Sequence, residues 1–241
     1  MGAGINAQLK IKAEEPLILD RADGYIGTLV DDLVTKGCSD PYRMMTSRSE
    51  YRLVLRQDNA DERLTPIGRR VGLVSDERWA HYIARNIAKI AELDRLHDTV
   101  LPPSDALTAL CEQNGTTPPQ TGVRLSELIK RPQLDYAKLA PVDPDRPALD
   151  PLVIEQLEVQ LKYEGYLKRQ EADIREMRRL ENRLLPDEID YDGITGLRKE
   201  AREKLGKVRP RSIGQASRIS GVSPADVAVL ILFLQARGDD K

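Results

Sequence analysis

Apolar residues recur at steps of three and four along much of the chain, which is the spacing of one helix face. The longest run begins after Ser75-Asp-Glu-Arg-Trp79, and Trp79, Ile83, Ile87, Ile90 and Leu93 stay in register as far as His97-Asp98. Shorter helices are predicted over Tyr25–Val34, from the cap-then-proline pair Thr65-Pro66 to about Gly72, and over Arg124–Arg131. The pattern therefore predicts a mainly α fold, a helical bundle.

A dense lattice of charges surrounds a narrow apolar seam over Ile154–Leu185, which indicates one long helix or a helix pair. Gly165 weakens the helix locally, which indicates a bend or close packing. The seam consists of Tyr163, Leu167, Ile174, Met177, Leu180 and Leu184. It fits an ordinary bundle helix or, as the alternative, an interface with another chain.

The last apolar run, Ala225–Gln235, follows a short segment that ends in a glycine turn at Gly221. The order helix, glycine turn, helix is typical of helix-turn-helix DNA-binding proteins. A recognition helix needs polar side chains for base edges, however, and after Asp226 this run is almost entirely apolar. We expect a buried helix, packed inside the bundle or against a partner, and no DNA binding.

Prolines concentrate in the loop at residues 141–147, the predicted domain boundary, because proline removes a backbone donor and disfavours helix in the residue before it. This boundary separates an arginine-rich segment with a first helical subdomain over 41–147 from a C-terminal helical subdomain over 148–241. The remaining predicted range, residues 1–40, rests on the family resemblance described below.

Composition narrows the function classes. A net charge of −2 excludes a general polycation, so contact with a polyanion should be local. Cys38 and Cys111 are isolated, which fits a reduced cytoplasmic setting, and His81 and His97 lack the spacing of paired metal ligands. No apolar run has the length of a membrane span, and the first residues lack a signal-peptide pattern. No nucleophile-base or paired-carboxylate arrangement predicts a catalytic residue.

The segment Pro41–Gly72 carries seven arginines, four acids and no lysine. Arginine presents a planar fork of donors that matches phosphate, which favours a phosphate partner. Ser47 and Glu50 have capping-box spacing, and a helix from Ser47 would place Arg48, Arg52 and Arg56 on one face. Together with Arg63, Arg69 and Arg70 they form the first predicted RNA-binding set. Two alternatives remain: an alternating strand, and arginines that only pair with neighbouring acids.

A second basic cluster lies between Arg198 and Arg218, where eight basic residues face two acidic ones. Lys207, Arg209 and Arg211 are its predicted phosphate contacts, and a solvated linker is the alternative interpretation.

Four segments in order resemble the C-terminal part of the MnmG family, also called GidA. They are Pro41–Gly72 with the following Leu73–Trp79, Gly24-Tyr-Ile-Gly-Thr-Leu-Val-Asp-Asp-Leu33, Leu161-Lys-Tyr-Glu-Gly-Tyr166, and Arg211-Ser-Ile-Gly-Gln-Ala-Ser-Arg-Ile-Ser-Gly-Val-Ser-Pro224. The matches span nearly the whole chain, so they are far more specific than one short motif.

This resemblance implies an FAD-dependent enzyme, using NADH, that modifies the wobble uridine of certain tRNAs, with the full-length protein a homodimer. It also implies docking of the GTPase MnmE on the helical C-terminal domain. The partner-binding residues it suggests are Glu200, Gly214, Gln215, Ser217, Arg218 and Gly221. The first forty residues would be a remnant of an α/β FAD domain, with Gly4 and Asn6 near the flavin of the full-length protein.

No glycine-rich turn of the GxGxxG type is present, so we expect no cofactor site and no catalysis in this chain alone. The favoured hypothesis is a tRNA- and partner-binding module of a longer enzyme. A helical interaction scaffold and a DNA-binding regulator are the alternatives.

Overall fold

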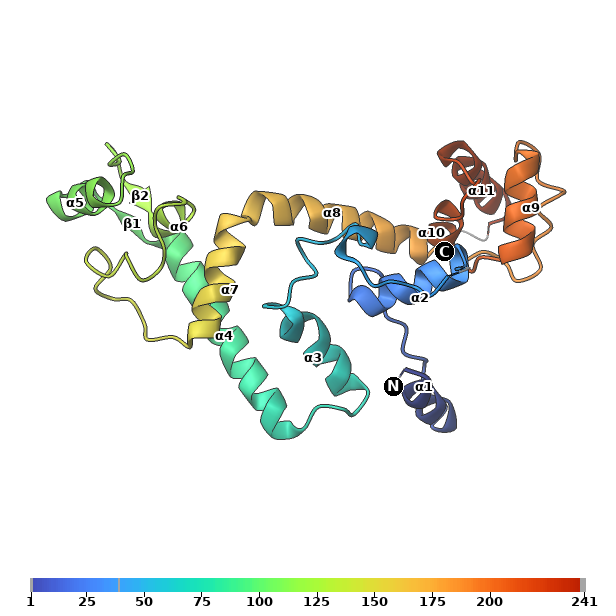
Figure 1. Cartoon of the computed structure of the whole chain (residues 1–241), viewed down its shortest axis with the longest axis horizontal. Coiled ribbons are helices and arrows are strands. Elements are labelled where there is room, and N and C mark those ends of the chain that lie inside the picture. The colour runs from blue at the N-terminus through green and yellow to red at the C-terminus, as the bar shows by residue number, and fades with distance from the viewer. Residues whose placement is uncertain (1, 39, 239–241) are drawn as a thin grey trace. The chain divides into compact units, whose positions relative to one another are not determined.

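The structure is a computed structural model that describes residues 2–38 and 40–238, and these residues are mainly helical (Figure 1). Their α-helices are α1 (Gly2–Ile11), α2 (Tyr25–Thr35), α3 (Ala60–Arg70), α4 (Asp76–Asp98), α5 (Asp105–Gln113), α6 (Leu125–Ile129), α7 (Pro151–Lys162), α8 (Glu164–Glu181), α9 (Lys199–Val208), α10 (Ile213–Ser217) and α11 (Pro224–Arg237). A short 3-10 helix, η1, covers Thr46–Arg48. The strands β1 (Val100–Leu101) and β2 (Val123–Arg124) form an antiparallel pair in which Val100 lies opposite Arg124. The predicted mainly α fold is confirmed.

The chain forms two compact units. Unit 1 contains residues 2–17 and 56–168, and unit 2 contains residues 18–55 and 169–238. This division differs from the predicted ranges. The proline-rich loop at residues 141–147 lies inside unit 1, because Leu139 before it and Leu157 after it are buried in the same hydrophobic core.

Unit 1 is built around α4, which packs against α3, α6 and α7. The helix begins where sequence predicts, because the Ser75 side chain accepts a hydrogen bond from the Arg78 amide. Its apolar face meets a core of aliphatic side chains that includes Leu96, Leu107, Leu125, Leu128 and Ile129.

The core of unit 2 lies among α9, α10, α11 and the loop that precedes α9. Helix α11 starts at a capping box, in which the Ser223 hydroxyl and the Asp226 carboxylate accept from each other's backbone amide. Leu230 and Leu234 are buried, and Val227, Val229, Ile231 and Phe233 pack against the same core. Leu232 remains 64% exposed. The apolar C-terminal helix is therefore mostly core.

The helix predicted from Ser47 is wrong. Only η1 forms there, and residues 49–59 follow as turns rather than as a helix or the alternative strand. The Glu50 carboxylate, which the prediction used as a cap, instead accepts two hydrogen bonds from Arg21 Nη2, at 2.8 and 3.0 Å. Arg48, Arg52 and Arg56 consequently share no helix face, and Arg56 belongs to the other unit.

The start of a further helix differs from prediction. α3 begins at Ala60 and carries Pro66 in its interior, with Asp61 and Glu62 in its first turn, where carboxylates are favoured by the helix dipole. Of the two alternatives for the charged run, the helix pair is observed: α7 and α8 are separated at Tyr163, and Gly165 lies in the first turn of α8.

Most of the seam on α8 is covered within unit 2. Ile174 is buried with Ala22, Tyr51 and Leu55, and Met177 packs against the same small cluster. Leu180 packs against the larger core, whereas Leu184, beyond the end of α8, is exposed. This part of the seam is thus ordinary packing within a bundle.

Candidate functional site

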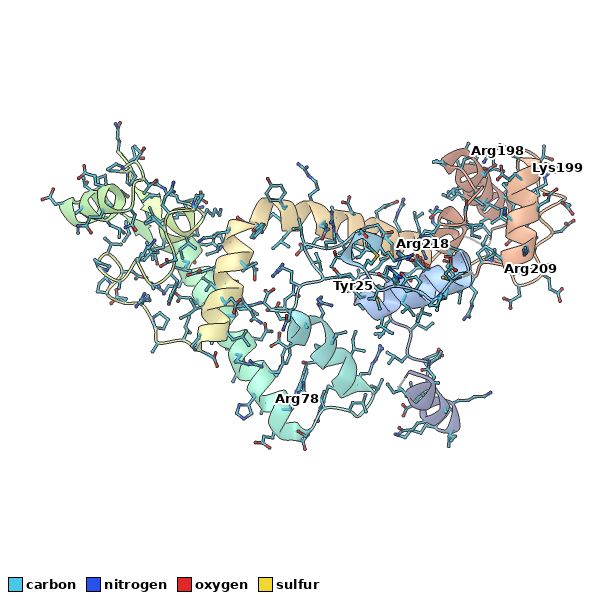
Figure 2. All side chains as sticks on the ribbon, in the orientation of Figure 1. Tyr25, Arg78, Arg198, Lys199, Arg209 and Arg218 are labelled. Carbon is cyan, nitrogen blue, oxygen red and sulfur yellow. The ribbon has the colours of Figure 1, made fainter. Side chains whose placement is uncertain are left out.

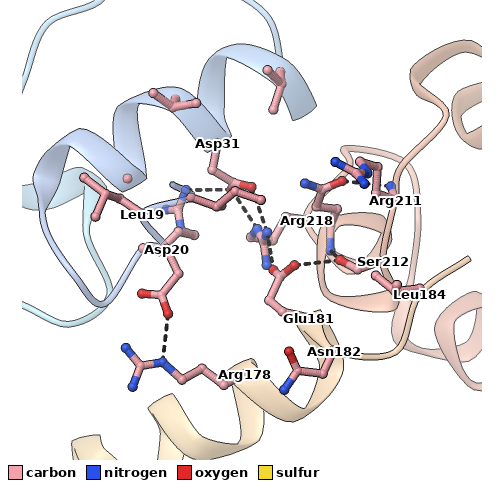
Figure 3. Close-up of a pocket in the computed structure, with 16 residues that line it drawn as sticks. Leu19, Asp20, Asp31, Arg178, Glu181, Asn182, Leu184, Arg211, Ser212 and Arg218 are labelled. Atoms are coloured by element: carbon pink, nitrogen blue, oxygen red, sulfur yellow. Dashed lines mark hydrogen bonds and ion pairs between the residues drawn. The ribbon is translucent and has the colours of Figure 1, made fainter. Parts of the chain in front are cut away.

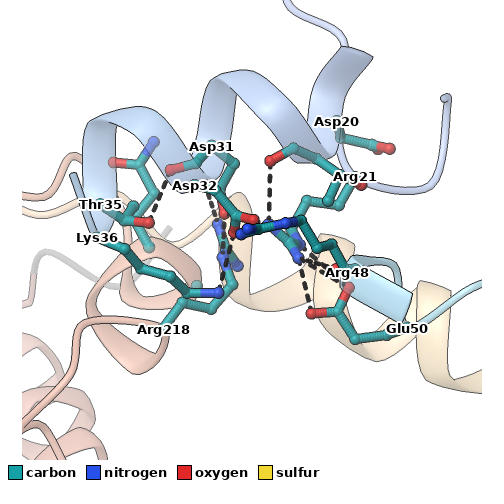
Figure 4. Close-up of polar contacts among 12 residues, drawn as sticks. Asp20, Arg21, Asp31, Asp32, Thr35, Lys36, Arg48, Glu50 and Arg218 are labelled. Atoms are coloured by element: carbon teal, nitrogen blue, oxygen red, sulfur yellow. Dashed lines mark hydrogen bonds and ion pairs between the residues drawn. The ribbon is translucent and has the colours of Figure 1, made fainter. Parts of the chain in front are cut away.

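A network of ion pairs in unit 2 joins the 18–55 segment to the C-terminal helices, and Arg21 is at its centre (Figure 4). Its side chain is only 3% exposed. Nη1 donates to the Asp31 and Asp32 carboxylates, each at 2.9 Å. Nη2 donates to the Glu50 carboxylate and, at 3.2 Å, to the backbone carbonyl of Arg48. Arg21 therefore fixes the turn that carries Arg48 to helix α2.

Arg218 forms the second branch of the network, at the C-terminal end of α10 (Figure 3). Its Nε and Nη2 donate to the two Asp31 oxygens, both at 2.7 Å, which is a bidentate fork. Nη2 also pairs with Glu181 on α8, whose other oxygen accepts from the Ser212 hydroxyl at 2.6 Å. Asp31 Oδ2 accepts from both Arg218 and Arg21 and links the two branches.

Asp32 receives hydrogen bonds from Lys36 Nζ at 2.9 Å and from the Tyr42 hydroxyl at 2.8 Å. Burial alone raises the pKa of this carboxyl, but the hydrogen bonds from Lys36, Tyr42 and Arg21 together outweigh burial and lower the pKa to about 2. The Tyr42 ring in turn lies 4.4 Å from the Arg48 guanidinium carbon. Asp32 is therefore ionised at neutral pH and holds Tyr42 beneath Arg48.

A cavity of about 480 Å³ opens beside this network, with Asp31, Glu181 and Arg218 among its polar lining (Figure 3). Exposed apolar side chains also line it: Ile18, Val30, Val34 and Leu184.

The arginines of the first predicted RNA-binding set are divided between the two units. Arg48 and Arg52 are exposed in unit 2, and Arg70 is exposed in unit 1. Within the described residues, Arg52 and Arg70 make no ion pair or hydrogen bond through their side chains. The others have internal partners: Arg56 pairs with Asp58, Arg63 donates to Asn59 and to the Arg56 carbonyl, and Arg69 pairs with Asp76 and donates to the Val74 carbonyl.

Arg43 is an exposed arginine that the predicted set omitted. It belongs to the same lysine-free segment as Arg48, and that membership was the signal that could have included it.

The second basic cluster begins at Arg198, the N-cap of α9, and its three predicted phosphate contacts lie at and beyond the C-terminal end of that helix. Figure 2 shows Lys199 and Arg209 at opposite ends of this helix. Arg209 has the left-handed backbone (φ 53°) of a helix C-cap and donates to the Ile189 carbonyl at 3.4 Å. Lys207 and Arg211 are exposed. The three predicted residues therefore lie on one short surface segment.

Two glycines among the predicted partner-binding residues lie close to glutamate side chains, and Gly221 also has a backbone conformation that other residues rarely adopt. A Cβ on Gly214 would lie 2.6 Å from the Glu181 carboxylate, and one on Gly221, where φ is +99°, would lie 2.7 Å from Glu200 Oε1. Glu200 and Ser217 are exposed. Gln215 accepts from the Arg211 amide, and Arg218 is mostly buried in the ion-pair network.

The expectation that Gly4 and Asn6 lie near the flavin of the full-length protein stays a prediction. Gly4 is exposed on α1, and the Asn6 side chain is engaged with Leu17, donating to its carbonyl and accepting from its amide. Within residues 2–38 and 40–238, the only strands are β1 and β2, so no strand leads through a glycine turn into a dinucleotide-binding helix.

Over the same described ranges, no three His, Cys, Asp or Glu side chains gather as metal ligands. None of the helices formed there combines the length and apolar character needed to cross a membrane.

Two family models match adjacent parts of the chain. The one for the C-terminal helical domain of the tRNA modifying enzyme MnmG/GidA matches residues 76–171, and the one for its C-terminal helical bundle matches residues 173–241. The chain belongs to the MnmG/GidA family. It is 53% identical over 233 residues to the tRNA uridine 5-carboxymethylaminomethyl modification enzyme MnmG of Caldicellulosiruptor saccharolyticus, covering 97% of this chain and 37% of that protein. The MnmG of Clostridium kluyveri is 52% identical, with 99% and 38% covered.

The solved structures agree. GidA of Aquifex aeolicus in its form II crystal matches with a TM-score of 0.81 and 38% identity, covering 96% of this chain and 36% of that chain. The chain thus spans little more than a third of the length of the MnmG relatives it matches, and it corresponds to their C-terminal helical part.

Proposed function

We propose that this chain is the tRNA-binding and partner-docking part of an MnmG-type enzyme that modifies the wobble uridine of tRNA. The observation that carries the proposal is the lysine-free arginine segment, which leaves Arg48 and Arg52 exposed. The relatives of this chain are named as tRNA uridine modification enzymes, and these names point to tRNA as the phosphate partner.

The arginines divide into two roles. Arg48, Arg52 and Arg70 are exposed, and with the surface segment Lys207, Arg209 and Arg211 they are the proposed contacts with tRNA phosphates. Arg56, Arg63 and Arg69 remain in the proposed set, but their internal partners support a structural contribution as well. For Arg56, Arg63 and Arg69, the same internal partners favour the alternative that the chain is a helical interaction scaffold.

The test compares an arginine without an internal partner among the described residues with one that has a partner. Removing one arginine that binds a phosphate should lower the slope of log affinity against log salt by about one. We expect Arg52→Gln to lower the slope measured with unfractionated tRNA, and Arg56→Gln to lower it less, because Arg56 is engaged by Asp58. Unchanged binding in a folded Arg48→Gln, Arg52→Gln double variant would support the scaffold alternative instead.

The proposed docking surface for the GTPase MnmE lies on α9 and α10, around Glu200, Gly214, Gln215, Ser217, Arg218 and Gly221. The support is the exposure of Glu200 and Ser217, together with the glycine backbone at Gly221, which brings the chain close to Glu200. Deleting residues 212–241 would remove Leu230 and Leu234 from the core, so surface substitutions are the sharper test.

Ser217→Glu adds an exposed charge to this surface without removing a core side chain. We expect it to weaken binding of purified MnmE at least about tenfold while the melting temperature stays within a few degrees. Thr121→Glu, at an exposed position of unit 1, is the control for added charge away from this surface. Equal MnmE affinity in both variants and the unmodified chain would place the docking surface elsewhere.

The remaining properties of the proposed whole protein follow from the family. It would be a cytoplasmic homodimer that uses FAD and NADH. The flavin would supply the redox chemistry of carbon transfer to uridine, and the residues of this chain would bind and orient the tRNA and the GTPase.

A further inference from the structure

We infer that Arg218 is a positioning residue for the arginine segment: through Asp31 and Arg21 it fixes the turn that presents Arg48 to RNA. The inference rests on the proposed RNA contact of Arg48. Arg218 would then have two roles. It lies at the border of the proposed docking surface, and it also orients the turn at Arg48 within unit 2.

The first step is the fork between Arg218 and Asp31. Both Asp31 oxygens accept from the same guanidinium at 2.7 Å, and the Arg218 side chain is only 16% exposed. A bidentate pair fixes direction as well as distance, because two parallel hydrogen bonds define the plane of both groups. Glu181 and its partner Ser212 hold the same guanidinium from α8 and the start of α10. The position of Asp31 relative to the C-terminal helices is thereby set.

The second step runs from Asp31 to the turn. Asp31 Oδ2 also accepts from Arg21, and Arg21 donates to Glu50 and to the Arg48 carbonyl. Among the described residues, the backbone of the turn is otherwise held by two short-range bonds, from the Arg48 amide to the Met45 carbonyl and from the Ser49 amide to the Thr46 carbonyl. Gln170 Nε2 of α8 adds a longer-range bond to the Glu50 carbonyl at 3.3 Å. Arg21 is therefore the residue that fixes this turn against α2.

The third step concerns the Arg48 side chain. Its guanidinium lies over the Tyr42 ring, and the Tyr42 hydroxyl donates to Asp32, which also accepts from Arg21. Backbone and side chain of Arg48 are thus held from the same two carboxylates of α2, Asp31 and Asp32. A guanidinium that is already oriented loses less conformational freedom when it binds a phosphate.

Removal of the Arg218 guanidinium should free Asp31 and loosen this series of hydrogen bonds. We expect Arg218→Gln to weaken binding of fluorescently labelled unfractionated tRNA about threefold to tenfold at low salt, as Arg48→Gln does, and to lower the salt slope by about one. If Arg218 acts through Arg48, the double variant should bind no more weakly than Arg48→Gln alone, because the coupled pair is non-additive. The assay uses this chain without MnmE, so docking does not contribute.

Arg198→Gln is the matched control. Arg198 also pairs with a buried carboxylate of unit 2, Asp226, and also donates to a backbone carbonyl, that of Gly221. The structure shows no contact from it to Asp31, Arg21 or the turn at residues 46–50. A general loss of stability would affect Arg198→Gln and Arg218→Gln alike, whereas positioning affects only Arg218→Gln.

Hydrogen exchange at the Arg48 and Ser49 amides gives a readout without RNA. Exchange there should quicken in Arg218→Gln and stay unchanged in Arg198→Gln. Should Arg218→Gln fail to fold, Asp31→Asn decides the same question, since it keeps the size of the side chain and removes its charge. Unchanged tRNA affinity and unchanged exchange in the folded variant overturn the inference. Unchanged affinity in Arg48→Gln overturns the RNA contact itself, and the inference with it.

Discussion

The core of unit 1 and the 18–55 segment of unit 2 are held by different interactions. In unit 1, side chains such as Leu96, Leu125 and Leu128 are fully buried against one another. The 18–55 segment contributes Ala22, Tyr51 and Leu55 to a small apolar cluster, with Tyr25 and Val54 packed against it. Ion pairs of Arg21 and Asp31, and of Asp20 and Asp23 with Arg178, add to this packing. Apolar burial is strong but non-directional, whereas a guanidinium fork fixes orientation. The comparison teaches that the segment carrying two of the proposed RNA contacts, Arg48 and Arg52, is oriented by charge as well as by apolar packing.

Buried ion pairs add less to stability than their number suggests, because desolvation opposes the attraction between the charges. Breaking one is nevertheless costly, since the remaining charge stays buried without a partner. We therefore expect unit 1 to respond most to a reduction in side-chain volume and the 18–55 segment to the removal of charge.

The largest effect should come from the aliphatic core of unit 1. Leu128 is fully buried, so Leu128→Ala removes its packing and leaves a cavity, at a cost of about 3 to 4 kcal/mol in the free energy of unfolding. Denaturant unfolding measures it. Leu232→Ala, at an exposed position, is the control and should change stability by less than about 0.5 kcal/mol. Similar losses in the two variants would show that burial does not set the response.

Arg21→Met tests the charged segment at comparable side-chain size. Asp32 would lose a buried partner, and we expect a loss of about 3 kcal/mol. Hydrogen exchange should quicken within residues 18–55 while the core amides of α4 keep their protection. Arg52→Met, at an exposed arginine, serves as the control and should be nearly neutral. A gain in stability would mean that desolvation of this network costs more than its pairing returns.

The same network predicts a response to acid. The pKa of Asp32 is lowered to about 2 in the folded chain and is about 3.9 for an unperturbed carboxyl. A lowered pKa stabilises the fold above the unfolded value, and this contribution disappears as the pH falls from about 4 toward 2. Asp32→Asn should therefore lose about 1 to 2 kcal/mol less than the unmodified chain over that interval, as followed by denaturant unfolding. Parallel pH profiles would contradict the role of Asp32.

The smallest effect on stability should come from a helix cap in unit 1. The Ser104 hydroxyl accepts from the Leu107 amide at the start of α5. Ser104→Ala should cost about 1 kcal/mol, and Ser104→Asp, which retains a capping oxygen, should restore most of it. Thermal unfolding at low and high salt checks both. If the stability lost in Ser104→Ala depended on salt, the uncharged hydroxyl cap would not explain it.

Much of the fold could be predicted from local sequence. The start of α4 at Ser75, the extent of α2 and the apolar helix α11 all follow from caps and from apolar periodicity, because backbone hydrogen bonds within a helix join residues four apart. The same local reasoning failed at Ser47. There the capping-box spacing was present, but Arg21 bound the Glu50 carboxylate.

The site depended on tertiary structure to a greater degree. The sequence alone determined a helical chain with a lysine-free arginine segment and a resemblance to MnmG across its length. It could not determine which arginines are exposed and which are paired, because Arg218 meets Asp31 across 187 positions of the chain. An ion pair leaves no periodic trace in the sequence, since any of the many acids in this chain could accept the same fork. Only the packing of the 18–55 segment against α8 and α10 selected Asp31, and with it the turn that presents Arg48.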